Sequence, residues 1–254
     1  MIIGIIPARY SSSRLPGKPL LKIGGKPMLQ HTFESASKSK LLSDIIIAVD
    51  DERVYDVAKS FGAQVQMTPK EMPTGSDRIA SVAEKLSGTD IIVNIQGDEP
   101  FIPAKMIDEA IEPLLFDSNV EVSTLAKRIV NEEDLNSPSV TKVVFDYNNY
   151  ALYFSRSPIP YVRDVVSDKQ KLRLADIYKH FGLYVFKKEK LLQFVSLRPT
   201  DLERYEKLEQ LRMLENGFKI KIVITEMESI SVDTSDDLDK VRLFYENMGS
   251  KNII

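Results

Sequence analysis

The segment from residue 2 to residue 20, IIGIIPARYSSSRLPGKPL, constrains the fold of this chain more than any other stretch. Residues 2–6 contain four isoleucines and no polar side chain. Such a run is typical of a strand that is buried on both faces of a parallel sheet. Pro7 is expected to end the strand, because proline has no backbone N–H to donate. Parallel strands need crossover connections, which are usually helices, so the segment predicts an α/β fold.

The loop after this strand carries only positive charge. It contains Arg9, Arg14 and Lys18 among small hydroxyl residues and Gly17, and the first acidic residue of the chain is Glu34. The first 33 residues hold five positive and no negative side chains, although the net charge of the whole chain is -3. Arginine forks and a lysine point charge suit a triphosphate and its leaving pyrophosphate. A solvated basic loop is the alternative interpretation, because the loop matches neither of the common glycine-rich phosphate motifs.

The composition excludes several classes of protein. The 254 residues are 43% hydrophobic and 28% charged, and the isoelectric point of about 5.6 argues against general nucleic-acid binding. The absence of cysteine excludes disulfides and thiolate metal sites, and two histidines leave little scope for zinc. Any metal is therefore expected to be a hard cation bound by carboxylates. No apolar run is long enough to span a membrane and no secretion signal is evident, so a cytoplasmic location is expected.

The first half of the chain alternates predicted strands and helices. After the first strand, apolar runs predict strands over 44–49, 64–67 and 91–95, and helices are expected over 27–40, 52–61, 76–86 and 103–112. Pro113 is expected to break or kink the last of these helices. This order predicts a mostly parallel sheet with right-handed crossovers, in which ligands bind beyond the carboxyl ends of the strands. The loops after residues 6, 49 and 95 should therefore be neighbours.

The second half has a different pattern. Asn148 and Asn149 tolerate positive φ and predict a hairpin between strands over 140–146 and 150–155. A proline-rich segment and a charged stretch to about Asp176 are interpreted as a mobile loop. Further elements are expected as strands over 181–186 and 218–225 and helices over 188–195, 201–216 and 236–248. No clear linker interrupts the chain, so residues 1–254 are interpreted as one domain, with a hairpin arm and loop inserted over about 138–180.

Two acidic residues lie where this topology predicts a ligand site. Asp98 follows the strand over 91–95, and the direction of Glu99 beside it is left open. Asp233 precedes the closing helix, where Thr234 and Ser235 are equally good helix caps. The alternatives are an acidic turn for Asp98 and a capping role for Asp233. Two carboxylates opposite a cationic loop would suffice for magnesium-assisted nucleotidyl transfer, and no nucleophilic triad is evident.

The order and wording of several motifs resemble one known family. PARYSSSRLPGKPL is similar to the nucleotide loop of the 3-deoxy-manno-octulosonate cytidylyltransferases, also called CMP-Kdo synthetases. The motifs TGSDRIA, NIQGDEPFIP, YALYFSRSPIPY, KHFGLY, LEQLR and SVDTSDDLDKVR resemble further motifs of that family in the same order. The resemblance extends from residue 2 to about residue 245.

The resemblance implies a GT-A-like α/β fold and a homodimer formed through the hairpin arm. It implies transfer of CMP from CTP to the anomeric C2 hydroxyl of Kdo, with release of pyrophosphate, for lipopolysaccharide synthesis. Mg²⁺ is the implied cofactor. CTP and a Kdo-type sugar acid are the implied partners, and neither nucleic acid nor a membrane is expected.

The resemblance also implies a set of site residues. Lys18, Asp98 and Asp233 are implied to be catalytic, and the two aspartates to bind magnesium. The nucleotide would be bound by Ala8, Arg9, Arg14, Lys18 and Arg78. The sugar pocket would be shaped by Gln96, Arg163, His180, Tyr184, Glu209 and Gln210. An arginine and a histidine could meet the carboxylate of Kdo, and the remaining polar groups could bind its hydroxyls.

Other interpretations remain open for some of these residues. Without the motif, His180 would be taken as a buried, hydrogen-bonded histidine, and His31 is interpreted as structural. The chain departs from the family pattern at TGSDR, which carries a shorter acid, at SISVDTSDD and at Phe186. These departures leave open 8-amino-8-deoxy-Kdo or a sialic acid as the sugar. A non-catalytic nucleotide-binding protein of the same fold is the alternative from another class.

Overall fold

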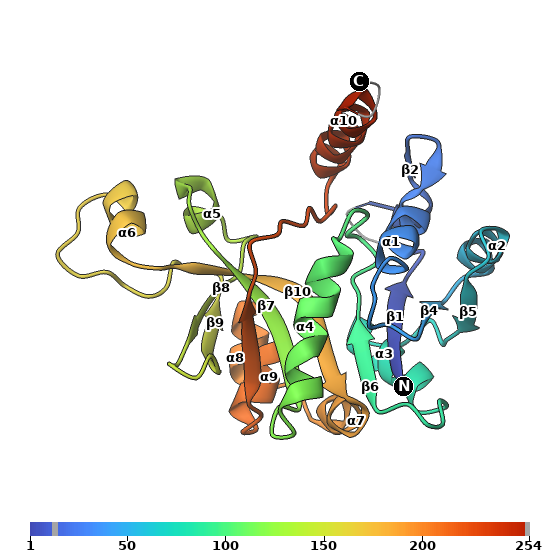
Figure 1. Cartoon of the computed structure of the whole chain (residues 1–254), viewed down its shortest axis with the longest axis horizontal. Helices are drawn as coiled ribbons and strands as arrows, with labels where there is room; N and C mark the ends of the chain where they lie inside the picture. Colours follow the sequence, from blue (N-terminus) through green and yellow to red (C-terminus); the bar gives the residue numbers. More distant parts are fainter. Residues whose placement is uncertain (12–14, 252–254) are drawn as a thin grey trace. The chain divides into compact units, whose positions relative to one another are not determined.

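The computed structural model describes residues 1–11 and 15–251, and the chain forms two compact units (Figure 1). Unit 1 consists of residues 1–108 and 228–254, and unit 2 of residues 109–227. The first boundary falls within helix α4, Ala104–Phe116. The interpretation of the chain as one domain with an inserted arm stays a prediction.

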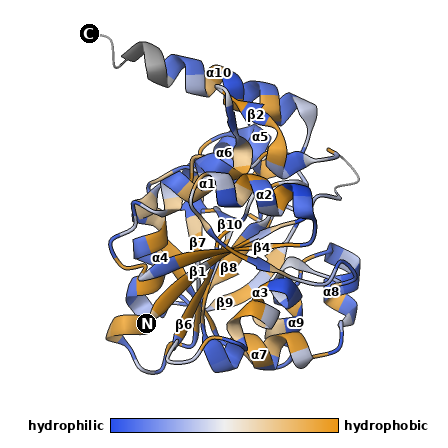
Figure 2. Cartoon of the chain, turned by 90° about the vertical axis from the view of Figure 1, so that its right-hand side faces the viewer, coloured by the Kyte–Doolittle hydropathy of each residue, from blue (hydrophilic) through white to orange (hydrophobic). Residues whose placement is uncertain are grey.

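Unit 1 is built on a parallel sheet. Its strands are β1 (Ile2–Ala8), β4 (Asp44–Val49), β5 (Gln64–Met67) and β6 (Ile91–Asn94), in the order β6-β1-β4-β5. In the register, Ile5 pairs with Ile46 on one side and Asn94 on the other. The strands are coloured mainly as hydrophobic in Figure 2, and Ile5, Ile6 and Ile47 are fully buried. Burial on both faces explains why β1 and β4 show no polar alternation, whereas β5, with the sequence QVQM, is partly exposed.

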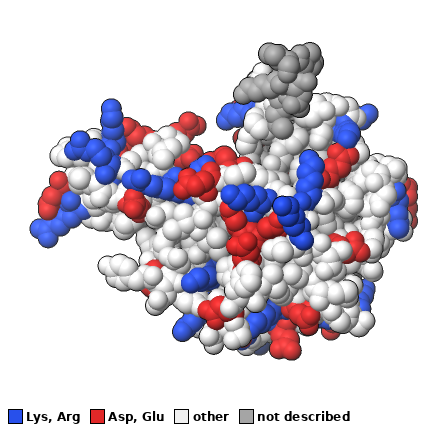
Figure 3. Space-filling model, viewed as in Figure 1, with Lys and Arg blue, Asp and Glu red and all other residues white. Residues whose placement is uncertain are grey.

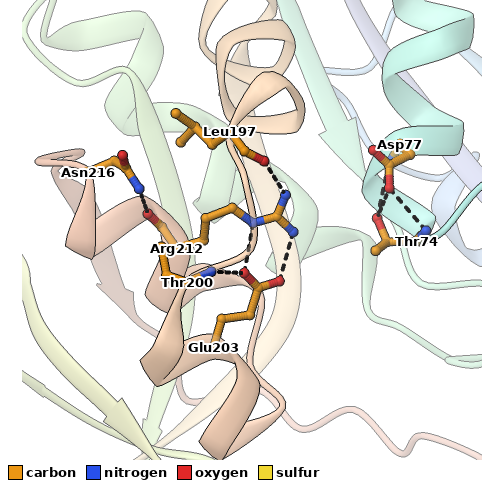
Figure 4. A network of polar contacts seen from close by, with 7 residues as sticks. All are labelled: Thr74, Asp77, Leu197, Thr200, Glu203, Arg212 and Asn216. Carbon is orange, nitrogen blue, oxygen red and sulfur yellow. Dashed lines mark hydrogen bonds and ion pairs between the residues drawn. The ribbon is translucent and has the colours of Figure 1, made fainter.

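Helices complete unit 1. They are α1 (Met28–Ala36), α2 (Glu52–Ser60), α3 (Gly75–Ala83) and α10 (Ser235–Lys251), with a short 3-10 turn at Lys18–Leu20 and a small ribbon of β2 (Lys22–Ile23) and β3 (Lys26–Pro27). Helix α3 begins with a capping box, in which the Asp77 carboxylate accepts hydrogen bonds from the backbone N–H and hydroxyl of Thr74 at 3.0 and 2.7 Å (Figure 4). The shorter acid of TGSDR therefore still closes this cap.

The prediction that Pro7 ends the first strand was wrong. Strand β1 continues to Ala8, and Pro7 and Ala8 pair with Ala48 and Val49 of β4. The carbonyl oxygen of Ile5 accepts a hydrogen bond from the β6 side, from the N–H of Ile95, at 3.1 Å. Backbone groups alternate sides along a strand, so the missing N–H of Pro7 also faces that side. The register with β6 ends at Asn94, before a Pro7 donor would be needed.

Unit 2 contains a mixed sheet. Strand β7 (Val122–Arg128) pairs antiparallel with β10 (Tyr178–Lys187) and parallel with β11 (Ile220–Ile224), and the hairpin of β8 (Lys142–Phe145) and β9 (Ala151–Ser155) joins through β8 to β10. Its helices are α5 (Glu132–Asn136), α6 (Asp168–Leu174), α7 (Lys188–Ser196), α8 (Asp201–Glu206) and α9 (Gln210–Glu215). The predicted hairpin is confirmed, and Asn149 has φ 58°.

Three sequence predictions in the second half and at its border were wrong. The helix predicted over 103–112 continues past Pro113 to Phe116, so Pro113 does not end it, and the expected kink stays a prediction. The predicted loop to Asp176 contains helix α6, because Ser167 caps its first turn and Leu172 packs on the cluster of Ile129, Leu135 and Ile177. The predicted helix over 201–216 is two helices. They are separated at Lys207, whose φ of 55° cannot continue a right-handed helix.

Among the described residues, no helix has the length and apolar character needed to cross a bilayer. Positive and negative side chains lie interspersed on the face shown in Figure 3. That face therefore does not carry the continuous basic surface that nucleic-acid binding usually requires.

Candidate active site

Three charged side chains from distant parts of the sequence meet in unit 1. The ammonium group of Lys18 lies 2.6 Å from an oxygen of Asp98 and 3.0 Å from an oxygen of Asp233. The three side chains are 13%, 29% and 42% exposed, respectively. Two carboxylates that contact one ammonium group are also close enough to share one metal cation. The expected convergence of Lys18, Asp98 and Asp233 is thus present in the structure.

Backbone contacts hold these three residues in place. The N–H of Val232 donates a hydrogen bond to the backbone oxygen of Asp98 at 2.9 Å, which places Asp233 beside Asp98. A Cβ atom on Gly97 would lie 2.7 Å from the carbonyl oxygen of Pro7, so only glycine permits this approach to the end of β1. Gly17 has φ 67° and turns the chain immediately before Lys18. The two glycines therefore set the position of the lysine and of the loop that carries Asp98.

A cavity of about 510 Å³ adjoins the three charged residues. It is lined by residues from the ends of β1 and β6, the 3-10 turn and the segment before α10, among them Ala8, Arg9, Lys18, Gln96, Asp98 and Asp233. A larger cavity of about 710 Å³ also occurs in unit 1. Of the charged residues in its lining, Lys26 and Glu34 bond each other at 2.8 Å, and Arg242 pairs with Asp239. The convergent carboxylates identify the smaller cavity as the candidate active site.

The remaining predicted nucleotide residues have different surroundings. The guanidinium group of Arg9 lines the cavity and donates a hydrogen bond to the carbonyl oxygen of Met72 at 2.9 Å. Arg78 is fully buried and bonds to Thr68 and to Asp50, so it contacts protein groups. Burial lowers the pKa of Arg78, while the charge of Asp50 opposes this shift. Arg14 lies outside the described residues.

Glu99 is separated from the cationic side of the site. It is 5% exposed, and its carboxylate accepts a hydrogen bond from the hydroxyl of Ser229 at 2.6 Å. Burial raises the pKa of Glu99 to about 7, the Ser229 hydrogen bond lowers it, and the charge of Asp98 raises it. Glu99 therefore turns toward Ser229, while its neighbour Asp98 bonds Lys18.

The predicted sugar residues His180 and Tyr184 lie together on β10 of unit 2. Their ring centroids are 5.3 Å apart, and His180 also meets Phe154 edge to face at 5.0 Å. The Thr124 hydroxyl lies 2.7 Å from the carbonyl oxygen of Leu183, to which it donates, and 2.9 Å from Nε2 of His180. A hydroxyl has one hydrogen, so we assign the Nε2–H of His180 as the donor to Thr124.

Burial keeps both of these side chains neutral. It lowers the pKa of His180 to about 3 and raises the pKa of Tyr184 well above its ordinary value, with a further contribution from the charge of Glu209. Among the described residues, the hydroxyl of Tyr184 is a buried polar atom without a hydrogen-bond partner. A neutral His180 offers no positive charge to a sugar carboxylate, so any attraction of that kind would have to come from elsewhere.

The other predicted sugar residues have different surroundings. Glu209 precedes helix α9, in which Gln210 is the first residue and is 7% exposed. Arg163 is 87% exposed, and its guanidinium group lies 3.5 Å from the carboxylate of Asp164. Gln96 belongs to unit 1, where its amide donates to Asn94 at 3.2 Å. Their roles toward the sugar stay predictions.

The LEQLR motif has a structural component that sequence reasoning missed. Arg212, its last residue, is 5% exposed and forms two hydrogen bonds of 2.9 and 2.8 Å with the carboxylate of Glu203 (Figure 4). A third N–H of Arg212 donates to the carbonyl oxygen of Leu197 at 3.1 Å. This fork ties α9 to α8 across the break at Lys207 and so fixes the start of α9, where Gln210 lies.

The donor set at the candidate site fits magnesium. Among the described residues, no three histidine, cysteine or acidic side chains gather as a metal site. Magnesium usually takes one or two protein carboxylates and completes its coordination with water and phosphate oxygens. Asp98 and Asp233, which already share one cationic partner, could supply two such ligands.

The comparisons with known proteins agree with this site and fold. A family model described as cytidylyltransferase matches residues 3–222, which places the chain in the class of nucleotidyltransferases. A 3-deoxy-manno-octulosonate cytidylyltransferase of Geotalea daltonii is 52% identical over 244 residues, covering 94% of this chain and 96% of the relative. The relative of the same name in Pelobacter propionicus is 50% identical and covers 98% of this chain and 99% of its own length. The chain therefore belongs to the 3-deoxy-manno-octulosonate cytidylyltransferase family, the CMP-Kdo synthetases.

A solved structure extends the comparison to three dimensions. The structure of CMP:2-keto-3-deoxy-manno-octonic acid synthetase complexed with CTP has a TM-score of 0.90 and 37% identity, and the match covers 97% of this chain and 99% of that chain. A cytidylyltransferase from Leptospira borgpetersenii, at 18% identity and a TM-score of 0.61, shares the fold. The predicted α/β fold, with a mostly parallel central sheet flanked by helices, is confirmed.

Proposed function

We propose that this chain transfers CMP from CTP to the anomeric C2 hydroxyl of Kdo. The hydroxyl oxygen forms a bond to the α-phosphorus, the bond from that phosphorus to the bridging oxygen of the β-phosphate breaks, and pyrophosphate leaves. The observation that carries the proposal is the meeting of Lys18, Asp98 and Asp233 beside the cavity that Arg9 lines. Direct displacement at phosphorus needs positioning and charge neutralisation and no covalent enzyme intermediate.

Each residue of the site has a distinct part in this proposal. Arg9 and Lys18 bind phosphate oxygens, and Lys18 offsets the charge that develops on the leaving pyrophosphate. Asp98 and Asp233 would hold Mg²⁺. A bound magnesium ion would neutralise phosphate charge and lower the pKa of the sugar hydroxyl. Without the two carboxylates, Lys18 and Arg9 would still attract CTP, but the site would have no protein ligands for Mg²⁺.

The names of the relatives support Kdo as the sugar substrate. The relatives at 50% and 52% identity are named for 3-deoxy-manno-octulosonate, so 8-amino-8-deoxy-Kdo and sialic acids are less favoured substrates. A non-catalytic nucleotide-binding role is also not favoured, because such a protein would need the cations and not both acids. The product would serve lipopolysaccharide synthesis in the cytoplasm.

The hairpin arm is proposed as the surface of a homodimer. Tyr147, at its turn, and Leu152, on β9, are fully exposed and 62% exposed in the single chain. Apolar side chains exposed in this way are often covered by a partner. Light scattering after gel filtration should give the mass of two chains, and Leu152→Asp should shift it toward one chain. A wild-type mass of one chain would reject this part of the proposal.

Pyrophosphate release tests the reaction. The wild-type protein is mixed with CTP and Mg²⁺ and supplied in turn with Kdo, 8-amino-8-deoxy-Kdo or N-acetylneuraminate. We expect rapid release with Kdo, little with the other two sugars and none without sugar or when the metal is chelated. The proposal would be rejected if Kdo gave no release, or if another sugar were preferred over Kdo.

A further inference from the structure

Asp50 is a buried acid that joins the cationic segment to the rest of unit 1. It follows β4, is 6% exposed, and uses its two oxygens for different partners. One oxygen accepts a hydrogen bond from the backbone N–H of Tyr10 at 3.0 Å, and the other accepts one from the guanidinium group of Arg78 at 3.1 Å. A single carboxylate therefore connects the residue after Arg9 with helix α3.

The partner of Asp50 is itself held rigidly. Arg78 is fully buried, and its second terminal nitrogen donates to the hydroxyl of Thr68. Thr68 directly follows β5, and both its hydroxyl and its N–H donate to the carbonyl oxygen of Val49 at 2.8 Å. Arg78 is thus fixed against the carboxyl ends of β4 and β5, which lie side by side (Figure 1). A buried arginine needs such a charged partner, and Asp50 supplies it.

Tyr10 transmits this fixed position to the catalytic lysine. Its carbonyl oxygen accepts a hydrogen bond from the N–H of Gly17 at 3.1 Å, and Lys18 is the next residue. The guanidinium group of Arg53 stacks 3.5 Å from the centroid of the Tyr10 ring. Tyr10 is therefore held by Asp50 through its N–H and by Arg53 through its ring, while its carbonyl oxygen holds Gly17. Arg9 precedes Tyr10 in the chain, so both phosphate-binding cations flank this anchored unit.

We propose that Asp50 is a positioning residue for the nucleotide site. It binds no ligand itself, and it sets the positions of Arg9 and Lys18 through the backbone of Tyr10, with Arg78 as its buried counterion. This inference rests on the proposed function, because it takes CTP as the nucleotide that the two cations bind. In this inference Arg78 helps to hold the loop through its bond to Asp50. This role does not depend on direct contact between Arg78 and the nucleotide.

Calorimetric titration with CTP tests the inference without relying on turnover. We expect Asp50→Asn to weaken CTP binding by about 10-fold or more, because the amide cannot balance the charge of Arg78. Asp50→Glu keeps the negative charge that pairs with Arg78, so this variant should fold. It moves the carboxylate oxygen that accepts from Tyr10, so the affinity for CTP should be several-fold weaker than in the wild type. Turnover by both variants should show a larger rise in the KM for CTP than fall in kcat.

Asp108→Asn is the matched control. Asp108 also accepts hydrogen bonds from backbone N–H groups in unit 1, those of Lys40 and Leu41. These two residues precede β4, whereas Asp50 follows it. Its loss should lower stability without changing CTP affinity. Wild-type affinity in Asp50→Glu, or an equal loss of affinity in Asp108→Asn at equal loss of stability, would overturn the inference. If the wild-type protein binds CTP without turning it over, the proposed function fails. The calorimetric titrations still test the role of Asp50, because they measure CTP binding alone.

Discussion

The convergent charged residues of unit 1 and the predicted sugar residues on β10 of unit 2 have opposite surroundings. In unit 1, Lys18, Asp98 and Asp233 remain partly exposed and paired with one another. In unit 2, burial holds His180 neutral, with a pKa of about 3, and also favours the neutral form of Tyr184. Under the proposed function, the charged residues of unit 1 would serve phosphate and metal chemistry, while His180 and Tyr184 would offer shape and uncharged hydrogen-bonding groups.

The largest effect should come from removing one charge in unit 1. We expect Asp98→Asn to lower kcat by about 100-fold or more, because a neutral amide is a poor magnesium ligand and leaves Asp233 alone with Lys18. The fold should survive, since both aspartates are partly exposed. Stopped-flow pyrophosphate release gives the rate. The control is Asp90→Asn, which removes an exposed acid paired with the N-terminus at 3.0 Å and should leave kcat unchanged.

Removing the titrating group from unit 2 should change the pH dependence of stability. The pKa of His180 is about 3 in the folded protein and 6.5 in the reference state, so the unfolded chain binds more protons between these values. The contribution of His180 is therefore fully present above about pH 6.5 and is lost as the pH falls toward 3, by roughly 1 kcal/mol per pH unit.

Urea unfolding of the wild type and His180→Gln at pH 5 and pH 7 measures this contribution. Relative to the variant, the wild type should gain roughly 2 kcal/mol on going from pH 5 to pH 7. Taking the difference between the two proteins removes the contributions of other titrating groups, including Glu99. An equal difference at both pH values would show that His180 is not held neutral.

Tyr184 allows a smaller test of recognition by neutral groups. Its hydroxyl is buried without a protein partner among the described residues, so Tyr184→Phe should leave stability unchanged or raise it by about 1 kcal/mol. If the hydroxyl binds the sugar, the KM for Kdo should rise about 5-fold to 10-fold while kcat stays the same. Thermal unfolding and steady-state kinetics measure the two effects. An unchanged KM would remove Tyr184 from the sugar site.

Arg163 should show the smallest effect on the fold. Because this side chain is 87% exposed, Arg163→Ala should change the free energy of unfolding by less than about 0.5 kcal/mol. Since His180 is neutral, an arginine is the better candidate for the sugar carboxylate, and the KM for Kdo should rise by about 3-fold or more. Arg173→Ala, an exposed arginine in α6, is the control. Equal kinetics in both variants would leave Arg163 as a solvated surface residue.

The convergence in unit 1 could be predicted from the sequence because it follows from topology. Apolar runs located β1, β4 and β6, and residues after parallel strands gather at one edge of the sheet. Asp50 gives the same sequence signal, directly after a strand, but a sequence does not show whether such an acid meets a ligand or a protein group. Its partner Arg78 was predicted to bind the nucleotide, since a sequence does not reveal that a cation is fully buried against an acid.

Other features depend on tertiary contacts that have no local signal. Helix α6 forms within a charged stretch because Leu172 packs on an apolar cluster that includes Ile129 and Leu135, which are distant in sequence. The break at Lys207 depends on a left-handed backbone at a residue that rarely adopts it, and the Arg212–Glu203 fork holds the helices on either side. Pro7 stays in its strand because of where the neighbouring strand ends. In each case the surroundings in the folded protein, rather than local sequence preference, decide the backbone conformation.

The sharing of one cation by Asp98 and Asp233 is tested most directly by a double-mutant cycle on pyrophosphate release with CTP, Kdo and Mg²⁺. The rates of the wild type, Asp98→Asn, Asp233→Asn and the double variant are compared. If both acids act on the same ion, the double variant should be little worse than the slower single variant. Losses that multiply, as for two independent sites, would contradict the account.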